Sequence, residues 1–186
     1  MSAAELVIVR HADTDWTASG QHTGHTDIPL NETGRVIATR LGPRLAEWSF
    51  AEVWCSPLQR AEQTCELAGY GERRVIHDEL VEWDYGRYEG ITRPEIEEQA
   101  PGWDLWRDGC PGGESVADVG ARADAALAQM PAEGWVLAFS HGHCLRVLIA
   151  RWLGLDPAEG ARFLLAPGAI GVLGHERDRR VLRRLG

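Results

Sequence analysis

The sequence contains no lysine, and all 19 basic residues among its 186 are arginine. With 28 acidic residues the formal net charge is −9, which argues against general binding to nucleic acids or to anionic membrane surfaces. No apolar run is long enough to cross a bilayer, and the N-terminus lacks the basic region and apolar stretch of a secretory signal. We therefore expect a cytoplasmic protein that binds neither nucleic acid nor membrane.

Cysteine is also scarce. The four cysteines form no Cys-x-x-Cys pair, so the sequence predicts no disulfide framework. Cys55 and Cys144 lie in apolar runs and are expected in the core. His22, His25 and His143 are tempting as metal ligands, but they form no His-Glu-x-x-His or paired Cys/His pattern. We expect no metal site.

What the chain does contain is an alternation of short apolar runs and helical patterns. Strands are expected at residues 6–9, 52–55, 75–77, 134–139, near 162–174 and at 179–185, and helices at 31–48, 57–68, 114–130 and 141–153. This alternation is typical of an α/β fold, a three-layer sandwich with a largely parallel central sheet flanked by helices. The length predicts a single domain over residues 1–186.

Prolines and two long irregular segments refine this outline. Pro43 lies inside the helical pattern 31–48 and should kink or divide that helix. Pro57 is expected in the first turn of the next helix. Residues 12–30 form a long polar loop, and residues 83–113 form an excursion rich in Trp, Gly and Pro. Loops of such length in a compact domain are usually functional, so we expect both segments to cover the site.

Anion-binding side chains follow three of the apolar runs. Arg10-His11 ends the first run, Arg60 follows residues 52–55, and His141 follows residues 135–139. Open α/β sheets bind their ligands at the carboxyl ends of the strands. Arginine donates forked hydrogen bonds to phosphate, and a guanidinium that follows an apolar strand is partly desolvated and needs an anion. The pattern predicts a site for a phosphate dianion.

Five short motifs occur in one order along the chain. They are Arg10-His11; Thr23-Gly24 before Asp27 to Gly34; Ser56-Pro57 with Arg60-Ala61 and Thr64; Glu82-Trp83-Asp84-Tyr85-Gly86 with Tyr88-Glu89-Gly90; and Ser140-His141-Gly142-His143. Together they resemble the histidine phosphatase superfamily, in its phosphoglycerate-mutase-like branch, over nearly the whole chain. The family usually has Gly after the Arg-His pair. Ala12 stands there instead, so we expect a small backbone adjustment without loss of the site.

The resemblance implies a role for each motif residue. His11 is the nucleophile that forms a transient phosphohistidine, which requires a neutral reactive nitrogen. Arg10 and Arg60 clamp the phosphoryl oxygens. His141, expected to be protonated, donates to a further oxygen. Gly142 and the neighbouring backbone N–H groups, at the start of the following helix, are expected to add to the anion site.

Hydrolysis also needs a proton for the leaving alkoxide and a base for the attacking water, and one carboxyl can serve both steps. Glu82, between Val81 and Trp83, is expected to do so, with Asp84 as the alternative. The remaining substrate contacts implied by the resemblance are Thr17, Gln21, Thr23, Gly24 and Tyr85. The resemblance also implies a reaction that needs neither metal nor cofactor.

These observations favour a phosphomonoester hydrolase that acts on small phosphorylated metabolites. A 2,3-bisphosphoglycerate-dependent phosphoglycerate mutase is the main alternative. Such mutases carry a longer insertion after the catalytic Glu, with Lys and Arg for the substrate carboxylate, whereas the segment from Glu82 to Glu114 is short. A non-catalytic phosphate-binding relative should have lost His11 or Glu82. Dephosphorylation of protein phosphohistidine is a minor alternative. The expected partner is a small phosphorylated substrate or inorganic phosphate, with a homodimer left open.

Overall fold

The computed structural model describes residues 3–186, and within them six strands form one sheet in the order β3-β2-β4-β1-β5-β6. The strands are β1 (Glu5–Arg10), β2 (Phe50–Cys55), β3 (Arg74–Ile76), β4 (Trp135–Ser140), β5 (Ile170–Glu176) and β6 (Arg179–Leu185). The first four run parallel to one another, β5 pairs antiparallel with β1, and β6 pairs antiparallel with β5. The predicted largely parallel sheet is confirmed.

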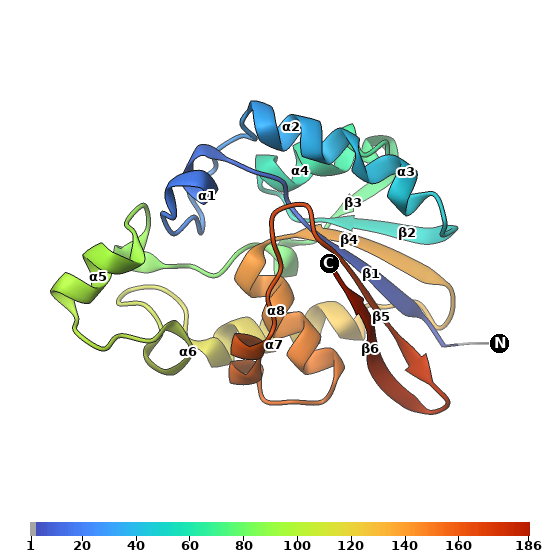
Figure 1. The fold of residues 1–186 in the computed structure, drawn as a ribbon. Helices are drawn as coiled ribbons and strands as arrows, with labels where there is room; N and C mark the ends of the chain where they lie inside the picture. Colours follow the sequence, from blue (N-terminus) through green and yellow to red (C-terminus); the bar gives the residue numbers. More distant parts are fainter. Residues whose placement is uncertain (1–2) are drawn as a thin grey trace.

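Helices cover both faces of this sheet. They are α1 (Asp15–Ser19), α2 (Glu32–Thr39), α3 (Leu41–Leu45), α4 (Gln59–Leu67), α5 (Arg93–Gln99), α6 (Leu105–Asp108), α7 (Val116–Ala128) and α8 (Gly142–Trp152). Figure 1 shows α2, α3 and α4 on one face, α7 and α8 on the other, and α1, α5 and α6 beyond the end of the sheet where β1 finishes. In the described part of the chain, no helix combines the length and apolar character needed to span a membrane.

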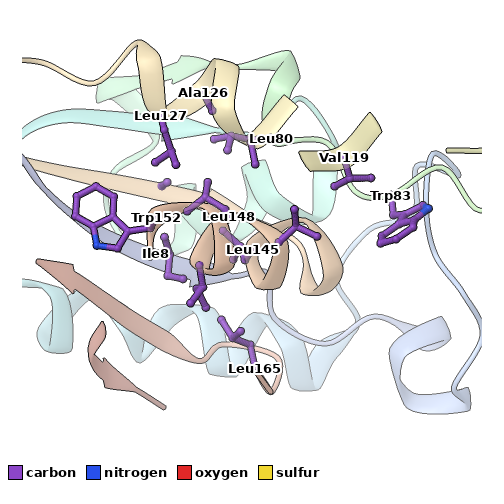
Figure 2. Close-up of a cluster of buried hydrophobic side chains, with 14 of the residues drawn as sticks. Ile8, Leu80, Trp83, Val119, Ala126, Leu127, Leu145, Leu148, Trp152 and Leu165 are labelled. Carbon is purple, nitrogen blue, oxygen red and sulfur yellow. The ribbon is translucent and has the colours of Figure 1, made fainter. Parts of the chain in front are cut away.

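The central strand β1 contributes to a separate apolar cluster on each face. Successive residues of a strand point to opposite sides, so Leu6 and Ile8 join the cluster under α7 and α8, while Val7 and Val9 join the one under α3 and α4. In Figure 2, α8 directs Leu145, Leu148 and Trp152 into the first cluster, beside Ile8 and Leu127. Burial on both faces explains why β1 has a continuous apolar run instead of an alternating pattern.

The two prolines behave differently. The pattern over residues 31–48 is divided as predicted: α2 ends at Thr39, and Pro43 lies in the first turn of α3, where its missing N–H removes no helical hydrogen bond. The placement of Pro57 in a helix is wrong. Leu58 is the N-cap of α4, so Pro57 belongs to the turn between β2 and α4.

Two predicted segments are also corrected. The strand near 162–174 begins only at Ile170, because Pro157–Arg162 is a 3-10 helix and the next residues form a loop. That loop crosses the end of β1, where the Gly168 N–H donates to the carbonyl oxygens of Arg10 (3.1 Å) and His11 (3.2 Å). The polar loop 12–30 contains the short helix α1, which was not predicted. Both segments lie at the end of the sheet that carries Arg10-His11.

Candidate active site

A cavity of about 250 Å³ opens where β1 ends. Its walls come from five segments that are distant in sequence: Arg10-His11, the loop around α1, residues 82–85, the first turns of α8, and Leu164-Leu165. The carboxyl ends of β1 and β4 meet here because the two strands are parallel neighbours, with Arg10 in register with Ser140. The predicted location of the site at this edge follows from that pairing.

His11 is held in one tautomer by its own main chain. Its Nδ1 lies 2.7 Å from the carbonyl oxygen of Ala12, which can only accept a hydrogen bond, so Nδ1 carries the proton and Nε2 keeps its lone pair. Only 2% of the residue is exposed. Burial, together with the positive charges of Arg60 and Arg10, holds the pKa of His11 well below its ordinary value. The imidazole is therefore neutral, as a nucleophile requires.

The Ala12 departure from the family motif is accommodated in the fold. Its N–H donates to Thr64 Oγ1 at 3.1 Å, and that hydroxyl donates to the carbonyl oxygen of Arg60 at 2.6 Å. The methyl group of Ala12 is fully buried in a small apolar cluster with Leu30 and Ala38. The side chain thus packs in space that helix α2 and its preceding loop fill.

Arg10 lines the cavity beside His11, and Gly142 makes room for it. The Nη1 of Arg10 donates to the carbonyl oxygen of Leu165 at 2.5 Å. Its Nε is buried and has no partner among residues 3–186. A Cβ atom at position 142 would lie 3.2 Å from the guanidinium carbon of Arg10, closer than most side chains tolerate. Gly142 therefore has a steric role that the motif alone did not reveal.

Arg60 lies behind His11 and does not reach the cavity wall. Its Nη1 donates to the Thr26 carbonyl oxygen (3.0 Å), and its Nη2 donates to those of Thr23 (3.2 Å) and Gly24 (2.7 Å). Its Nε donates to His141 Nδ1 at 3.1 Å. Four of its five N–H groups are thus used within the protein. Arg60 therefore fixes the loop at residues 12–30, called the first loop below. This structural role was not predicted from the sequence.

The prediction of a protonated His141 is wrong. Its Nδ1 accepts from Arg60, so its proton lies on Nε2, which donates to Ser56 Oγ at 2.7 Å. Burial lowers the pKa of His141 well below its ordinary value, and the positive charges of Arg60 and Arg10 act in the same direction. Only an added negative charge near the ring, such as a phosphate dianion, would raise that pKa.

Glu82 is the carboxylate that the fold brings to the cavity. Its Oε1 accepts from the N–H groups of Trp83 (2.9 Å) and Cys144 (2.8 Å), and its Oε2 accepts from that of His143 (3.1 Å). These donors include two from the first turn of α8. Two of the N–H groups next to Gly142 are thus bonded to Glu82 and are not free for a phosphate, whereas a contact between Gly142 itself and the phosphate stays a prediction. Asp84 lies outside the cavity wall, where its Oδ1 accepts from Gly86 N–H at 2.8 Å.

The other expected substrate contacts divide into two groups. The cavity wall includes Thr17, Gln21, Thr23 and Tyr85. Gly24 is not part of it: its N–H donates to Glu89 at 2.8 Å, and a Cβ there would lie 2.5 Å from the Trp83 carbonyl oxygen. Gly24 is thus a close-packing position outside the cavity wall.

Three further polar residues line the cavity that the sequence did not single out for this site. His22 and His143 were considered only as metal ligands, and Arg146 was not singled out. His143 Nδ1 shares a hydrogen bond with Tyr85 Oη at 2.5 Å. Among residues 3–186, no three His, Cys, Asp or Glu side chains gather in a group that could hold a metal ion. The i, i+4 spacing from Gly142 to Arg146 on the predicted helix could have identified Arg146, because such residues share a helix face.

The chain is similar to known proteins along nearly its whole length. It matches the histidine phosphatase superfamily (branch 1) over residues 6–186. It is 44% identical over 186 residues to an acid phosphatase of Mycobacterium tuberculosis, with 97% of this chain and 91% of that protein covered. It is 36% identical over 183 residues to the sedoheptulose 1,7-bisphosphatase of Saccharomyces cerevisiae, with 80% and 67% covered.

A solved structure agrees with these matches. The structure of a functionally characterised open reading frame of Mycobacterium tuberculosis superimposes with a TM-score of 0.92 at 43% identity, covering 98% of this chain and 97% of that one. The chain belongs to the histidine phosphatase superfamily, as its motifs predicted. Its predicted enzyme class, a phosphomonoester hydrolase, is confirmed with it.

Proposed function

We propose that this enzyme hydrolyses phosphomonoesters of small metabolites through a phosphohistidine on His11, without a metal ion. The observation that supports this most strongly is the His11 tautomer. The Nδ1–H bond to Ala12 leaves the Nε2 lone pair as the nucleophile, and Arg10 supplies positive charge at the same end of the cavity. No proton has to be removed from His11 before it attacks phosphorus.

In the first step, a bond forms between His11 Nε2 and phosphorus while the ester P–O bond breaks. The leaving oxygen takes a proton from Glu82. Arg10 neutralises charge on the phosphoryl oxygens, with its unpartnered Nε as one available donor. Arg60 adds positive charge near His11 from outside the cavity wall. His141 holds Arg60 in place by accepting a hydrogen bond from its Nε.

In the second step, water attacks phosphorus and the P–Nε2 bond breaks. The Glu82 carboxylate accepts a proton from this water and so regains the proton that the next leaving oxygen needs. The three N–H groups that donate to Glu82 hold its carboxyl group in one orientation at the cavity. Thr17, Gln21, Thr23 and Tyr85 would contact the substrate beyond the transferred group.

The first test is release of inorganic phosphate from a panel of phosphorylated metabolites, with a chelator present throughout. In parallel, 3-phosphoglycerate is tested for isomerisation, which would reveal the mutase alternative. Acid quenching with labelled substrate should trap one phosphoryl group on His11. The His11→Asn variant should release no phosphate and trap no label, whereas His25→Asn, a change outside the cavity wall, should behave like the unaltered protein.

Near-normal turnover by His11→Asn would contradict the proposed nucleophile. Activity that a chelator abolishes and a divalent cation restores would contradict the metal-independent reaction. The cytoplasmic location and the choice between monomer and homodimer stay predictions from the sequence.

A further inference from the structure

Arg146 is a cation in the cavity wall that the proposed chemistry does not use. Its Nε donates to the Gly160 carbonyl oxygen at 3.1 Å and its Nη2 to that of Ala161 at 3.0 Å. Its guanidinium carbon lies 4.6 Å from the centre of the Trp106 ring. Two carbonyls and an aromatic face therefore hold the guanidinium in one place, which lowers the entropy that it would lose on binding a ligand.

The fixed guanidinium still has binding capacity. Its Nη1 donates to no other group within residues 3–186, and in that range the side chain forms no ion pair with a carboxylate. The neighbouring arginine on the same helix, Arg151, contrasts with it: its Nε lies 2.9 Å from Asp124 Oδ1. A half-buried cation without a counter-ion loses hydration that a bound anion would compensate.

Arg146 lies apart from Arg10, beside which the transferred phosphoryl group is proposed to bind. The guanidinium of Arg10 lies against Gly142, at the first turn of α8. Arg146 follows on the same helix face four residues later, about 6 Å along the axis. Arg10 and Arg146 are the only two arginines among the described residues of the wall. Two cations in one cavity wall of this size can hold two anionic groups of one small molecule.

We propose that Arg146 binds a second anionic group, a carboxylate or a phosphate, on the leaving-group side of the substrate. The preferred substrates are then small phosphorylated metabolites that carry two anionic groups. This inference rests on the proposed function, because it assumes that the transferred phosphoryl group lies at His11 and Arg10. The cavity wall also includes Trp16 and the 79% exposed Leu164, which offer an anion no charge.

The test compares esters that differ only in the second anion. One pair is 3-phosphoglycerate and glycerol 3-phosphate, which isolates a carboxylate. The other is fructose 1,6-bisphosphate and fructose 1-phosphate, which isolates a phosphate, and p-nitrophenyl phosphate serves as the ester with a good leaving group. The readout is the ratio of kcat/KM values within each pair, measured for the unaltered enzyme, Arg146→Gln, Arg146→Lys and the control Arg151→Gln.

We expect the unaltered enzyme to prefer the two-anion member of at least one pair, and that pair identifies the anion. Arg146→Gln should reduce this preference about 10- to 100-fold, mainly through KM, because a charged hydrogen-bonded contact is lost. Arg146→Lys should restore part of the preference, and 0.5 M NaCl should weaken it in the unaltered enzyme. Arg151→Gln should keep the ratio of the unaltered enzyme. Since each ratio is measured within one variant, partial unfolding does not change it.

Three results would overturn the inference. The first is no preference for a second anion in either pair, and the second is a preference that Arg146→Gln leaves intact. The third is an equal loss on all five esters, which would place Arg146 at the transferred phosphoryl group. Failure of the proposed function looks different: the unaltered enzyme would release phosphate from none of the esters, p-nitrophenyl phosphate included.

Discussion

The imidazole rings of His11 and His141 lie 5.1 Å apart between their centroids, and they carry their protons on opposite nitrogens. His11 is protonated on Nδ1 because it faces a carbonyl oxygen. His141 is protonated on Nε2 because Arg60 donates to its Nδ1. Both rings are buried and neutral, although the family resemblance implied a charged His141. The pair has a measurable effect on how stability depends on pH.

Stability should fall as the pH is lowered through about 6.5, the ordinary pKa of histidine. In the unfolded chain both imidazoles take up protons below that pH, whereas burial keeps the pKa values of His11 and His141 well below it in the folded protein. The unfolded state then binds more protons, so the free energy of unfolding decreases with falling pH, by at most about 2.7 kcal/mol per pH unit for the two groups.

Urea unfolding at pH 7.5, 6.5 and 5.5 measures this slope. The His141→Asn variant should show a slope smaller by about 0.7 kcal/mol per pH unit on average over this range, and by at most about 1.4 kcal/mol per pH unit at its acidic end. His25→Asn, a change at an exposed histidine, serves as the control and should keep the original slope. A free energy of unfolding that stays level or rises between pH 7.5 and 5.5 would show that the buried pair is not neutral.

Glu82→Gln should separate acid catalysis from substrate binding. Loss of a positioned general acid costs about 10²- to 10⁴-fold on sugar phosphates, whose leaving groups need a proton. The loss on p-nitrophenyl phosphate should be much smaller, since nitrophenolate leaves without one. The kcat/KM values for both esters are compared with those of Asp84→Asn, a carboxylate outside the cavity wall. Equal losses on the two esters would argue against Glu82 as the leaving-group acid.

Gly142→Ala should weaken binding of inorganic phosphate or vanadate while leaving the protein folded. The new Cβ would lie 3.2 Å from the guanidinium carbon of Arg10 and displace that side chain. Alanine favours the helical conformation over glycine by up to about 1 kcal/mol, so α8 itself should not be weakened. Competitive inhibition by vanadate measures the effect, and thermal unfolding checks the fold. Unchanged vanadate affinity would mean that Arg10 does not bind the anion.

Arg60→Met should loosen the first loop. The substitution leaves three carbonyl oxygens, those of Thr23, Gly24 and Thr26, without their donor. A buried acceptor without a partner costs about 1–3 kcal/mol, so we expect a loss of several kcal/mol in the free energy of unfolding. Limited proteolysis should cut within residues 15–30 sooner than in Arg35→Met, a change at an exposed arginine. Equal cleavage rates would contradict the role of Arg60 in the loop.

Much of the fold was predictable because burial leaves a regular trace in the sequence. The apolar run Leu6 to Val9 indicates a strand that is buried on both faces, and it pairs with β4 and β5 as a central strand. The strand near 162–174 was predicted too long for the same reason. Leu165 is apolar and buried, but it packs from a loop that crosses the end of β1, and a short sequence window does not distinguish the two situations.

The candidate site was predictable in its position and less so in its contacts. Arg10, His11 and Glu82 lie at the cavity because strand ends and motifs place their backbones there. The guanidinium N–H groups of Arg60, in contrast, donate to carbonyl oxygens in the first loop, more than 30 residues away in the sequence. Such a pairing depends on how the loop folds back across α4, which no local pattern shows.

The order of the strands also determines when the surroundings of His11 can form during synthesis. Strand β1, which ends just before His11, is the first of the six strands to be made, yet it lies between β4 and β5, which come more than a hundred residues later. At elongation rates of about 5–20 residues per second this is a delay on the order of ten seconds. Until then, β1 has none of its pairing partners and the Gly168 N–H is absent from its end. A nascent chain therefore carries an incomplete candidate site until both β4 and β5 have been translated.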